Sequence, residues 1–128
     1  MAGGVLDTSA ALALIYDEPG ANKVRAALPG ASMSAVNVAE VLTVLIRHGI
    51  PEPQAIGLLQ RLGLTVRDFA TDHAIVAARL QTVKAEARRI SLGDRACLAT
   101  AIALGVPAVT ADRNWQGLGL PVHVEFIR

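Results

Sequence analysis

The chain contains a single cysteine, Cys97, and three histidines that stand far apart, His48, His73 and His123. One thiol excludes a disulfide within the chain, so there is no reason to expect an oxidising compartment. The histidines have no cysteine partners near them in the sequence, which argues against a zinc site. Because Cys97 stands among alanines, we expect it to be a small core residue.

Aromatic residues make up only 3% of the chain, and the formal net charge is only +1. A net charge so close to zero argues against a histone-like or tail-driven binder of nucleic acids. The basic residues are nevertheless mostly arginine, the better bidentate partner for phosphate, and they outnumber the acids between residues 61 and 95. A solvated helix face is the alternative interpretation of that basic region.

The N-terminus shows no basic segment leading into a long apolar one, so no signal peptide is visible. The longest uncharged run, residues 96–111, contains Gly105-Val106-Pro107 and is too short to span a bilayer. We therefore expect a cytoplasmic protein with no membrane segment. What the chain has in abundance is alanine and other apolar residues, which favour one helix-rich domain over residues 1–128 and an apolar interface with another subunit.

The segment 91–115, SLGDRACLATAIALGVPAVTADRNW, predicts a helix that begins near Asp94 and ends at Gly105. Residues 108–110 then predict a short buried strand, and Asp112 follows its carboxyl end. Parallel α/β sheets gather their ligand sites at the carboxyl ends of the strands. Both acids are therefore candidates for one site at that edge.

Strand and helix patterns alternate along the rest of the chain. The predicted strands are residues 3–6, 31–33, 64–66 and 122–126, and the predicted helices are residues 10–16, 22–28, 35–48, 54–62 and 73–86. Alternation of this kind predicts an α/β fold, a three-layer α/β/α sandwich with a mostly parallel sheet of about four to five strands and right-handed crossovers.

Two further acids stand out in this pattern. Asp7 follows the first predicted strand, where it is either a helix cap or a carboxylate at the sheet edge. Glu40 lies within the apolar pattern of the third predicted helix. An unpaired buried carboxylate costs several kcal/mol, so Glu40 needs a partner, a metal or solvent. The alternative is a place on a polar stripe with Asn37 and Thr43.

If Asp7, Glu40, Asp94 and Asp112 met at one edge, their charges would repel one another and their pKa values would rise. A hard divalent cation resolves such repulsion, and oxygen-only ligands suit Mg²⁺ or Mn²⁺. A site of this kind turns a bound water into a nucleophile and stabilises charge on a phosphoryl group. The sequence contains no glycine-rich nucleotide-binding motif and no supported serine–histidine or cysteine–histidine pair.

Four segments, VLDTSA, SAVNVAEVL, SLGDRACLATAIALGVP and AVTADRNW, resemble the PIN domain in their order and spacing. More narrowly, they resemble the VapC-type toxins of type II toxin–antitoxin pairs. The resemblance covers nearly the whole chain and implies a metal-dependent endoribonuclease that uses Mg²⁺ or Mn²⁺. The family's catalytic and metal-binding acids match Asp7, Glu40, Asp94 and Asp112. The supporting positions match Ser9 and Thr110.

One position departs from the family pattern. Many relatives carry a further acid two residues after the last aspartate, where this chain has Asn114. A neutral amide can orient a ligand or a water but supplies less charge. The resemblance therefore implies the first metal position more strongly than a second one.

The resemblance also implies partners, namely an RNA substrate, a second copy of the chain and a small VapB-like antitoxin. An antitoxin would lay a helix across an apolar groove, which residues 10–16 and 38–59 would supply, although core packing explains the same residues equally well. Candidate RNA contacts are Arg88, Arg89, Arg95, Arg113 and Trp115, four for phosphate and one for base stacking. Arg88 and Arg89 also suit the basic end of a helix, where cations favour the dipole.

Three alternatives remain open. A receiver domain of a signalling pathway is also a small α/β protein with clustered acids, but it needs paired acids after the first strand and a lysine late in the chain, which are missing. A non-catalytic PIN-like module would bind RNA or protein without cutting. A DNA nuclease would use the same metal chemistry.

Overall fold

The computed structural model describes residues 3–85 and 88–128. Its centre is a parallel sheet of five strands in the order β3-β2-β1-β6-β7. The strands are β1 (Val5–Leu6), β2 (Ser32–Ser34), β3 (Thr65–Arg67), β6 (Ala108–Thr110) and β7 (Val124–Phe126). The predicted α/β fold with a mostly parallel sheet is confirmed, and the first and last strands of the chain's sheet, β1 and β7, are shorter than predicted while the other three have the predicted length.

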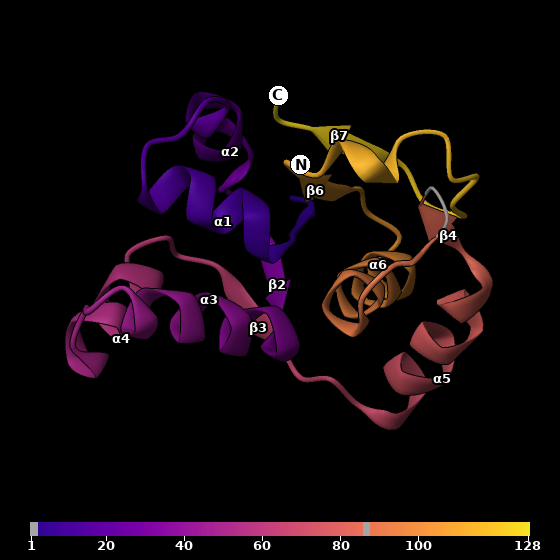
Figure 1. Ribbon diagram of the computed structural model, residues 1–128, viewed down its shortest axis with the longest axis horizontal. Helices are drawn as coiled ribbons and strands as arrows, with labels where there is room; N and C mark the ends of the chain where they lie inside the picture. Colours follow the sequence, from indigo (N-terminus) through magenta and orange to yellow (C-terminus); the bar gives the residue numbers. More distant parts are fainter. Residues whose placement is uncertain (1–2, 86–87) are drawn as a thin grey trace.

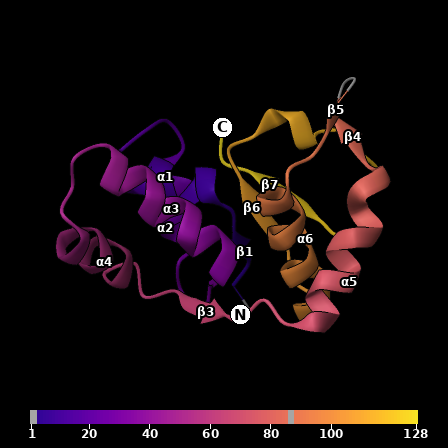
Figure 2. The same ribbon diagram turned by 60° about the horizontal axis from the view of Figure 1, so that its bottom comes forward.

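Helices lie on both sides of the strands, with α1 to α4 on one side and α5 and α6 on the other (Figures 1 and 2). They are α1 (Thr8–Ile15), α2 (Ala21–Ala27), α3 (Ala35–Arg47), α4 (Glu52–Gln60), α5 (Thr71–Arg79) and α6 (Leu92–Leu104). Two apolar clusters match this arrangement, one under α1 to α4 and one between α6 and the β6–β7 side of the sheet. No helix of the described residues is long and apolar enough to cross a membrane.

Side chains at the helix ends explain where the longer helices begin and end. The Oγ of Ser34 accepts a hydrogen bond from the backbone N–H of Val36 at 3.2 Å and so caps α3, as predicted. Ser91 caps α6 in the same way, and Gly105 ends that helix with a positive φ of 66°, a conformation that glycine adopts without strain.

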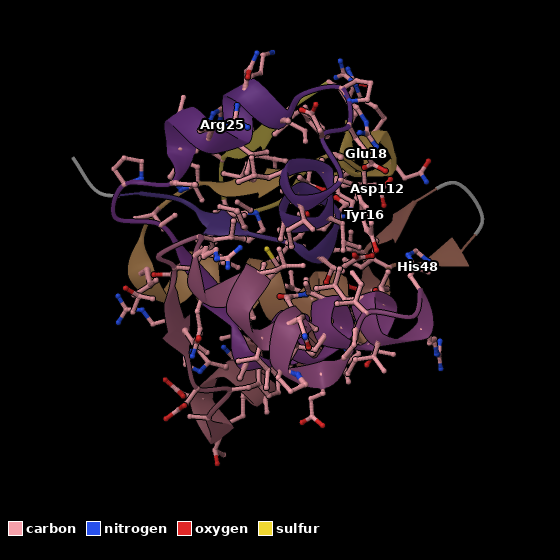
Figure 3. All side chains as sticks on the ribbon, turned by 90° about the vertical axis from the view of Figure 1, so that its left-hand side faces the viewer. Tyr16, Glu18, Arg25, His48 and Asp112 are labelled. Atoms are coloured by element: carbon pink, nitrogen blue, oxygen red, sulfur yellow. The ribbon has the colours of Figure 1, made fainter. Side chains whose placement is uncertain are left out.

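The residues that cap the C-terminal ends of α1 and α3, Tyr16 and His48, contact each other. The Oη of Tyr16 lies 2.7 Å from the Nδ1 of His48, and the two side chains point toward one another (Figure 3). Beside them, a guanidinium nitrogen of Arg128 lies 3.5 Å from a carboxylate oxygen of Glu18. These exposed contacts hold the C-terminal end of α1 to neighbouring segments.

The predicted helix over residues 73–86 is wrong in its second half. The helix α5 ends at Arg79, a 3₁₀ turn covers Leu80–Thr82, and β4 (Lys84–Ala85) then pairs antiparallel with β5 (Arg88–Arg89). Residues 84–87 have good helix propensity. The helix has nevertheless ended before it reaches them, because Leu80 is buried in a 3₁₀ turn and Val83 is extended. The predicted end of the helix at Glu86 lies outside the described residues.

Candidate active site

The site lies at the centre of the sheet, where the strand order reverses. From β1 the chain proceeds to β2 and β3 on one side, whereas β6 and β7 lie on the other. Ligand sites of open α/β sheets form beyond the carboxyl ends of the strands at such a switch point. Asp7 directly follows β1, and its backbone N–H donates to the carbonyl of Val109 in β6 at 3.0 Å. Asp112 follows β6 two residues later, so both acids lie at this edge.

Asp7 is buried, with 3% of its surface exposed, and both of its carboxylate oxygens accept hydrogen bonds. Oδ1 accepts from the N–H of Ala10 and from the hydroxyl of Ser9, each at 2.8 Å. Oδ2 accepts from the hydroxyl of Thr110 at 2.5 Å. The two interpretations of Asp7 are therefore compatible, because it caps α1 and also lies at the sheet edge.

Burial raises the pKa of Asp7 from 3.8 to about 6. The hydrogen bonds from Thr110, Ala10 and Ser9 oppose this rise, and the charge of Asp94 adds to it. The carboxylate thus pays a desolvation cost that its hydrogen bonds offset only in part.

The two supporting hydroxyls form a short chain between the start of α1 and β6. The Oγ of Ser9 lies 3.3 Å from the Oγ1 of Thr110 and accepts from the N–H of Ala111 at 2.9 Å. The Oγ1 of Thr110 accepts from the N–H of Asp112 at 3.0 Å. Ser9 and Thr110 therefore fix Asp7 and also the backbone that leads to Asp112.

Glu40 reaches the site from α3 and is partly exposed. Its Oε1 accepts from the hydroxyl of Thr8 at 2.5 Å and from the side-chain amide of Asn37 at 3.0 Å. A β-carbon on Gly93 would collide with the Glu40 carboxylate, so this carboxylate lies against the first turn of α6. Glu40 is thus a partnered acid with access to solvent.

One carboxylate oxygen of Asp94 and one of Asp112 accept a hydrogen bond from a backbone N–H nearby in the sequence. The Oδ2 of Asp94 accepts from the N–H of Ser91 at 3.2 Å, while the Oγ of Ser91 accepts from the N–H of Asp94 at 3.1 Å. The Oδ1 of Asp112 accepts from the N–H of Asn114 at 2.9 Å. Burial, followed by the charges of Asp112 and Glu40, raises the pKa of Asp94. Asp94 therefore lies within electrostatic reach of each of the other three acids.

The donor set fits a hard divalent cation in type and charge. It consists of carboxylate oxygens alone, and none of these acids forms an ion pair within residues 3–85 and 88–128. In the same ranges, no three acidic, histidine or cysteine side chains already surround one point at ligand distance. A cation bound here would need the carboxylates to lie closer together than they do in this structure.

The predicted RNA contacts have different placements. Trp115 is 2% exposed and packs in the cluster beside α6, so its ring is not available for stacking on a base. The Nη1 of Arg95 donates to the carbonyl of Ala77 at 3.0 Å, which directs this arginine to α5 instead of to a phosphate. Arg113 is exposed, and its guanidinium lies 5.1 Å from the ring centre of Phe126. The side chains of Arg88 and Arg89 lie outside what the structure describes.

Three residues near the acids were not predicted from the sequence as part of the site, namely Thr8, Asn37 and Gly93. The spacing of Asn37 three residues before Glu40 was an available signal, because residues i and i+3 share a helix face. The contact of Gly93 depends on how α3 and α6 pack and has no local signal. Cys97 is buried as expected, and burial together with the nearby acids raises the pKa of its thiol.

Comparison with solved structures finds the same fold in several proteins. A toxin–antitoxin complex from Klebsiella pneumoniae is 17% identical, with a TM-score of 0.75 and coverage of 98% of both chains. VapBC-5 from Mycobacterium tuberculosis, a member of the VapBC family of toxin–antitoxin systems, is 28% identical, with a TM-score of 0.63 and coverage of 100% of this chain and 99% of that one.

VapC20 from Mycobacterium tuberculosis, a sarcin–ricin loop cleaving toxin, is 19% identical, with a TM-score of 0.72 and coverage of 91% of this chain and 95% of that one. The search among curated proteins found no match. The family profile of the PIN domain matches residues 4–119, which includes all four acids. This chain therefore belongs to the PIN domain family.

Proposed function

We propose that this protein is a metal-dependent endoribonuclease and the toxin of a VapBC-type pair. The observation that supports the proposal is that Asp7 and Asp112 follow neighbouring strands at the switch point of the sheet, while Asp94 lies in the first turn of α6 and Glu40 lies against that turn. They come from four separate segments, and no described basic side chain neutralises them. A protein that needed only stability would not gather uncompensated carboxylates in this way.

PIN-domain nucleases generally use divalent metal ions. When bound, Mg²⁺ or Mn²⁺ would lower the pKa of a water molecule and neutralise charge on the phosphoryl group. Hydrolysis joins the oxygen of that water to phosphorus and breaks a phosphorus–oxygen bond to the next ribose. The chain's own part is to hold the carboxylates, Asp7 through Thr110, Ser9 and Ala10, and Glu40 through Thr8 and Asn37.

RNA is the favoured substrate because one solved relative is a toxin that cleaves the sarcin–ricin loop. The exposed Arg113 follows Asp112 directly and is free to contact a phosphate beside the acids. Arg88 and Arg89 stay a prediction for the same role.

An antitoxin is the favoured protein partner because several solved relatives are toxin–antitoxin complexes. Two large apolar side chains of this half of the fold are exposed, Ile56 of α4 at 37% and Val66 of β3 at 50%. Val66 lines a small pocket of about 190 Å³, together with Val38, Leu59, Gln60 and Leu64. A helix from an antitoxin or from a second copy of this chain would cover this surface.

A cleavage assay tests the proposed activity. Purified protein is incubated with total cellular RNA in Mg²⁺, Mn²⁺ or EDTA, beside the variants Asp7→Asn and Asp94→Asn and a single-stranded DNA of similar length. We expect discrete RNA fragments that require metal and disappear in both variants. Cutting that persists in EDTA, or that is unchanged in both variants, would refute the proposal.

The second candidate is a PIN-like module that binds RNA or protein without cutting. The observation in its favour is that the described carboxylates do not converge at ligand distance. Such a module would retain RNA in a gel-shift assay while showing no metal-dependent fragments, so the same preparations separate the two functions.

A further inference from the structure

Asn37 is a buried polar residue on α3 that contacts Glu40 and takes no direct part in the proposed reaction. It is 1% exposed, and its side-chain Nδ2 lies near three acceptors. Nδ2 donates to the Oε1 of Glu40 and to the backbone carbonyl of Gly93, each at 3.0 Å, and lies 3.3 Å from the Oγ1 of Thr8. One amide group thus connects α3, the start of α1 and the first turn of α6.

The orientation of this amide follows from its surroundings. All three neighbouring groups present acceptor oxygens, so the NH₂ must face them, and the reversed amide would leave them without its donors. The Oδ1 of Asn37 then lies buried with no hydrogen-bond partner in the described part of the chain. A buried acceptor without a partner lowers stability, so the value of asparagine here lies in its donors.

Gly93 provides the other half of the arrangement. A β-carbon at this position would meet the Oε1, Oε2 and Cδ of Glu40. Glycine therefore lets the carboxylate lie against α6, and Asn37 holds it there through Oε1. Asp94 is the next residue, so the Glu40 carboxylate lies beside the helical turn that carries Asp94.

We propose that Asn37 is a positioning residue that holds the Glu40 carboxylate against the first turn of α6, beside Asp94. Together with Gly93 it sets the separation of these two acids and so the affinity of the site for a divalent cation. The inference rests on the proposed metal site and names a residue through which that site is built. Partners that orient ligand side chains typically change metal affinity by about 10–100-fold when they are removed.

The first test uses Gly93→Ala, with Gly57→Ala as its matched control. Both glycines lie in helices, and a β-carbon at Gly57 meets nothing within 4 Å. The three atoms nearest to the new methyl group at position 93 all belong to the flexible end of Glu40, so we expect this variant to fold and to displace the carboxylate. We expect Mn²⁺ affinity, measured by calorimetry in RNA-free buffer, to fall about tenfold or more for Gly93→Ala and to stay unchanged for Gly57→Ala.

The second test uses Asn37→Ala, with Val41→Ala as its control. Val41 lies one turn further along α3, is completely buried, and packs in the apolar cluster under α1 to α4. Both variants lose buried contacts and are expected to have a lower Tm. Only Asn37→Ala is expected to lose Mn²⁺ affinity by about tenfold or more, because it alone removes the donor to Glu40. An affinity loss caused by lower stability in general would appear in both variants.

The inference and the proposed function can fail separately. If the wild-type protein cuts RNA and both Asn37→Ala and Gly93→Ala bind Mn²⁺ as it does, positioning by Asn37 is refuted while the nuclease stands. If the wild-type protein binds Mn²⁺ without cutting RNA and the two variants lose affinity, the nuclease is refuted while positioning stands. A wild-type protein that binds no Mn²⁺ overturns the inference.

Discussion

At the scale of single residues, Asp7 combines a cap with a charge that its surroundings do not solvate. Its side chain accepts a hydrogen bond from the N–H of Ala10 and so caps α1, which favours the ionised form. Burial favours the protonated form. Burial has the larger effect, so the pKa rises to about 6. The ionised carboxylate of Asp7 therefore lowers the stability of the folded protein near neutral pH.

The raised pKa of Asp7 fixes the sign of its effect on stability. Above about pH 6 the group is ionised in both states, and the folded state carries the cost of the buried charge. Below pH 3.8 the group is protonated in both states, and the cost disappears. The shift from 3.8 to about 6 corresponds to about 3 kcal/mol of stability lost as pH rises through that range.

We therefore expect Asp7→Asn to unfold at higher urea concentration than the wild-type protein at pH 7.5 in EDTA. The amide keeps an acceptor for the N–H of Ala10 and removes the charge. The gain should shrink toward zero near pH 3.5. The exposed Asp68 provides the control, since Asp68→Asn should show no such dependence. A gain that stayed the same at both pH values would contradict the assignment to the Asp7 charge.

Asn114 is the residue at which this chain departs from many relatives. Its N–H donates to Asp112, which places position 114 next to an acid of the site. We expect Asn114→Asp to bind Mn²⁺ several-fold more tightly, because it adds a carboxylate ligand. Calorimetric titration gives the affinity and the number of sites. Equal affinity and stoichiometry in the two proteins would show that position 114 does not face the cation.

At the scale of helices and strands, local signals in the sequence predicted most elements. Ser34, Ser91 and Gly105 are strong capping signals, and the helices they delimit were predicted well. The second half of the helix predicted from His73 failed, because residues 84–87 favour a helix locally while packing of the chain around Leu80 favours a turn and a hairpin. Propensity describes only the segment itself.

The positions of the acids could also be predicted from local signals, whereas the residues that contact them could not. Asp7 and Asp112 follow predicted strands, so their common edge could be inferred from strand order alone. The roles of Thr8 and Gly93 depend on the approach of α1 and α6 to Glu40, which no single segment specifies. Burial of Trp115 likewise depends on how the chain after β6 folds back over α6.

The Thr110 hydroxyl provides a prediction at this scale, since it joins β6 to the start of α1. Thr110→Val removes the donor to Asp7 and the acceptor for the N–H of Asp112. We expect a loss of about 1–3 kcal/mol in the free energy of unfolding, measured with urea. In the control Thr100→Val, only a bond to the Ala96 carbonyl within α6 is lost, and the effect should be smaller. An equal loss in both variants would argue against a special role for Thr110.

At the scale of the whole molecule, apolar side chains are exposed on more than one surface. Val66 lines the small pocket beside α4 and Ile56 is exposed on α4, whereas Ile75, which is 49% exposed, lies on α5 at the other side of the sheet. An antitoxin that lies across the first surface would bury Ile56 and Val66 and leave Ile75 exposed. The two surfaces therefore serve as test and control.

We expect Ile56→Lys with Val66→Lys to abolish capture of the proposed VapB-like antitoxin, while Ile75→Lys retains it. All of these positions are exposed, so Tm should change little. Co-purification from cells that express both proteins gives the result, and size-exclusion chromatography reports whether self-association changes instead. Retention of the antitoxin by the double variant would move its binding site elsewhere.

The order of the strands has a consequence for how the protein could be divided. Residues up to β3 contribute three adjacent strands, with Asp7 and Glu40, while residues from α5 onward contribute β6 and β7, with Asp94 and Asp112. The boundary in the sheet is the single seam where Val5 pairs with Ala108. A cut in the connection between β3 and α5 would therefore give two fragments with half the acids each, inert apart and complete only when they reassociate, which is the design of a split enzyme.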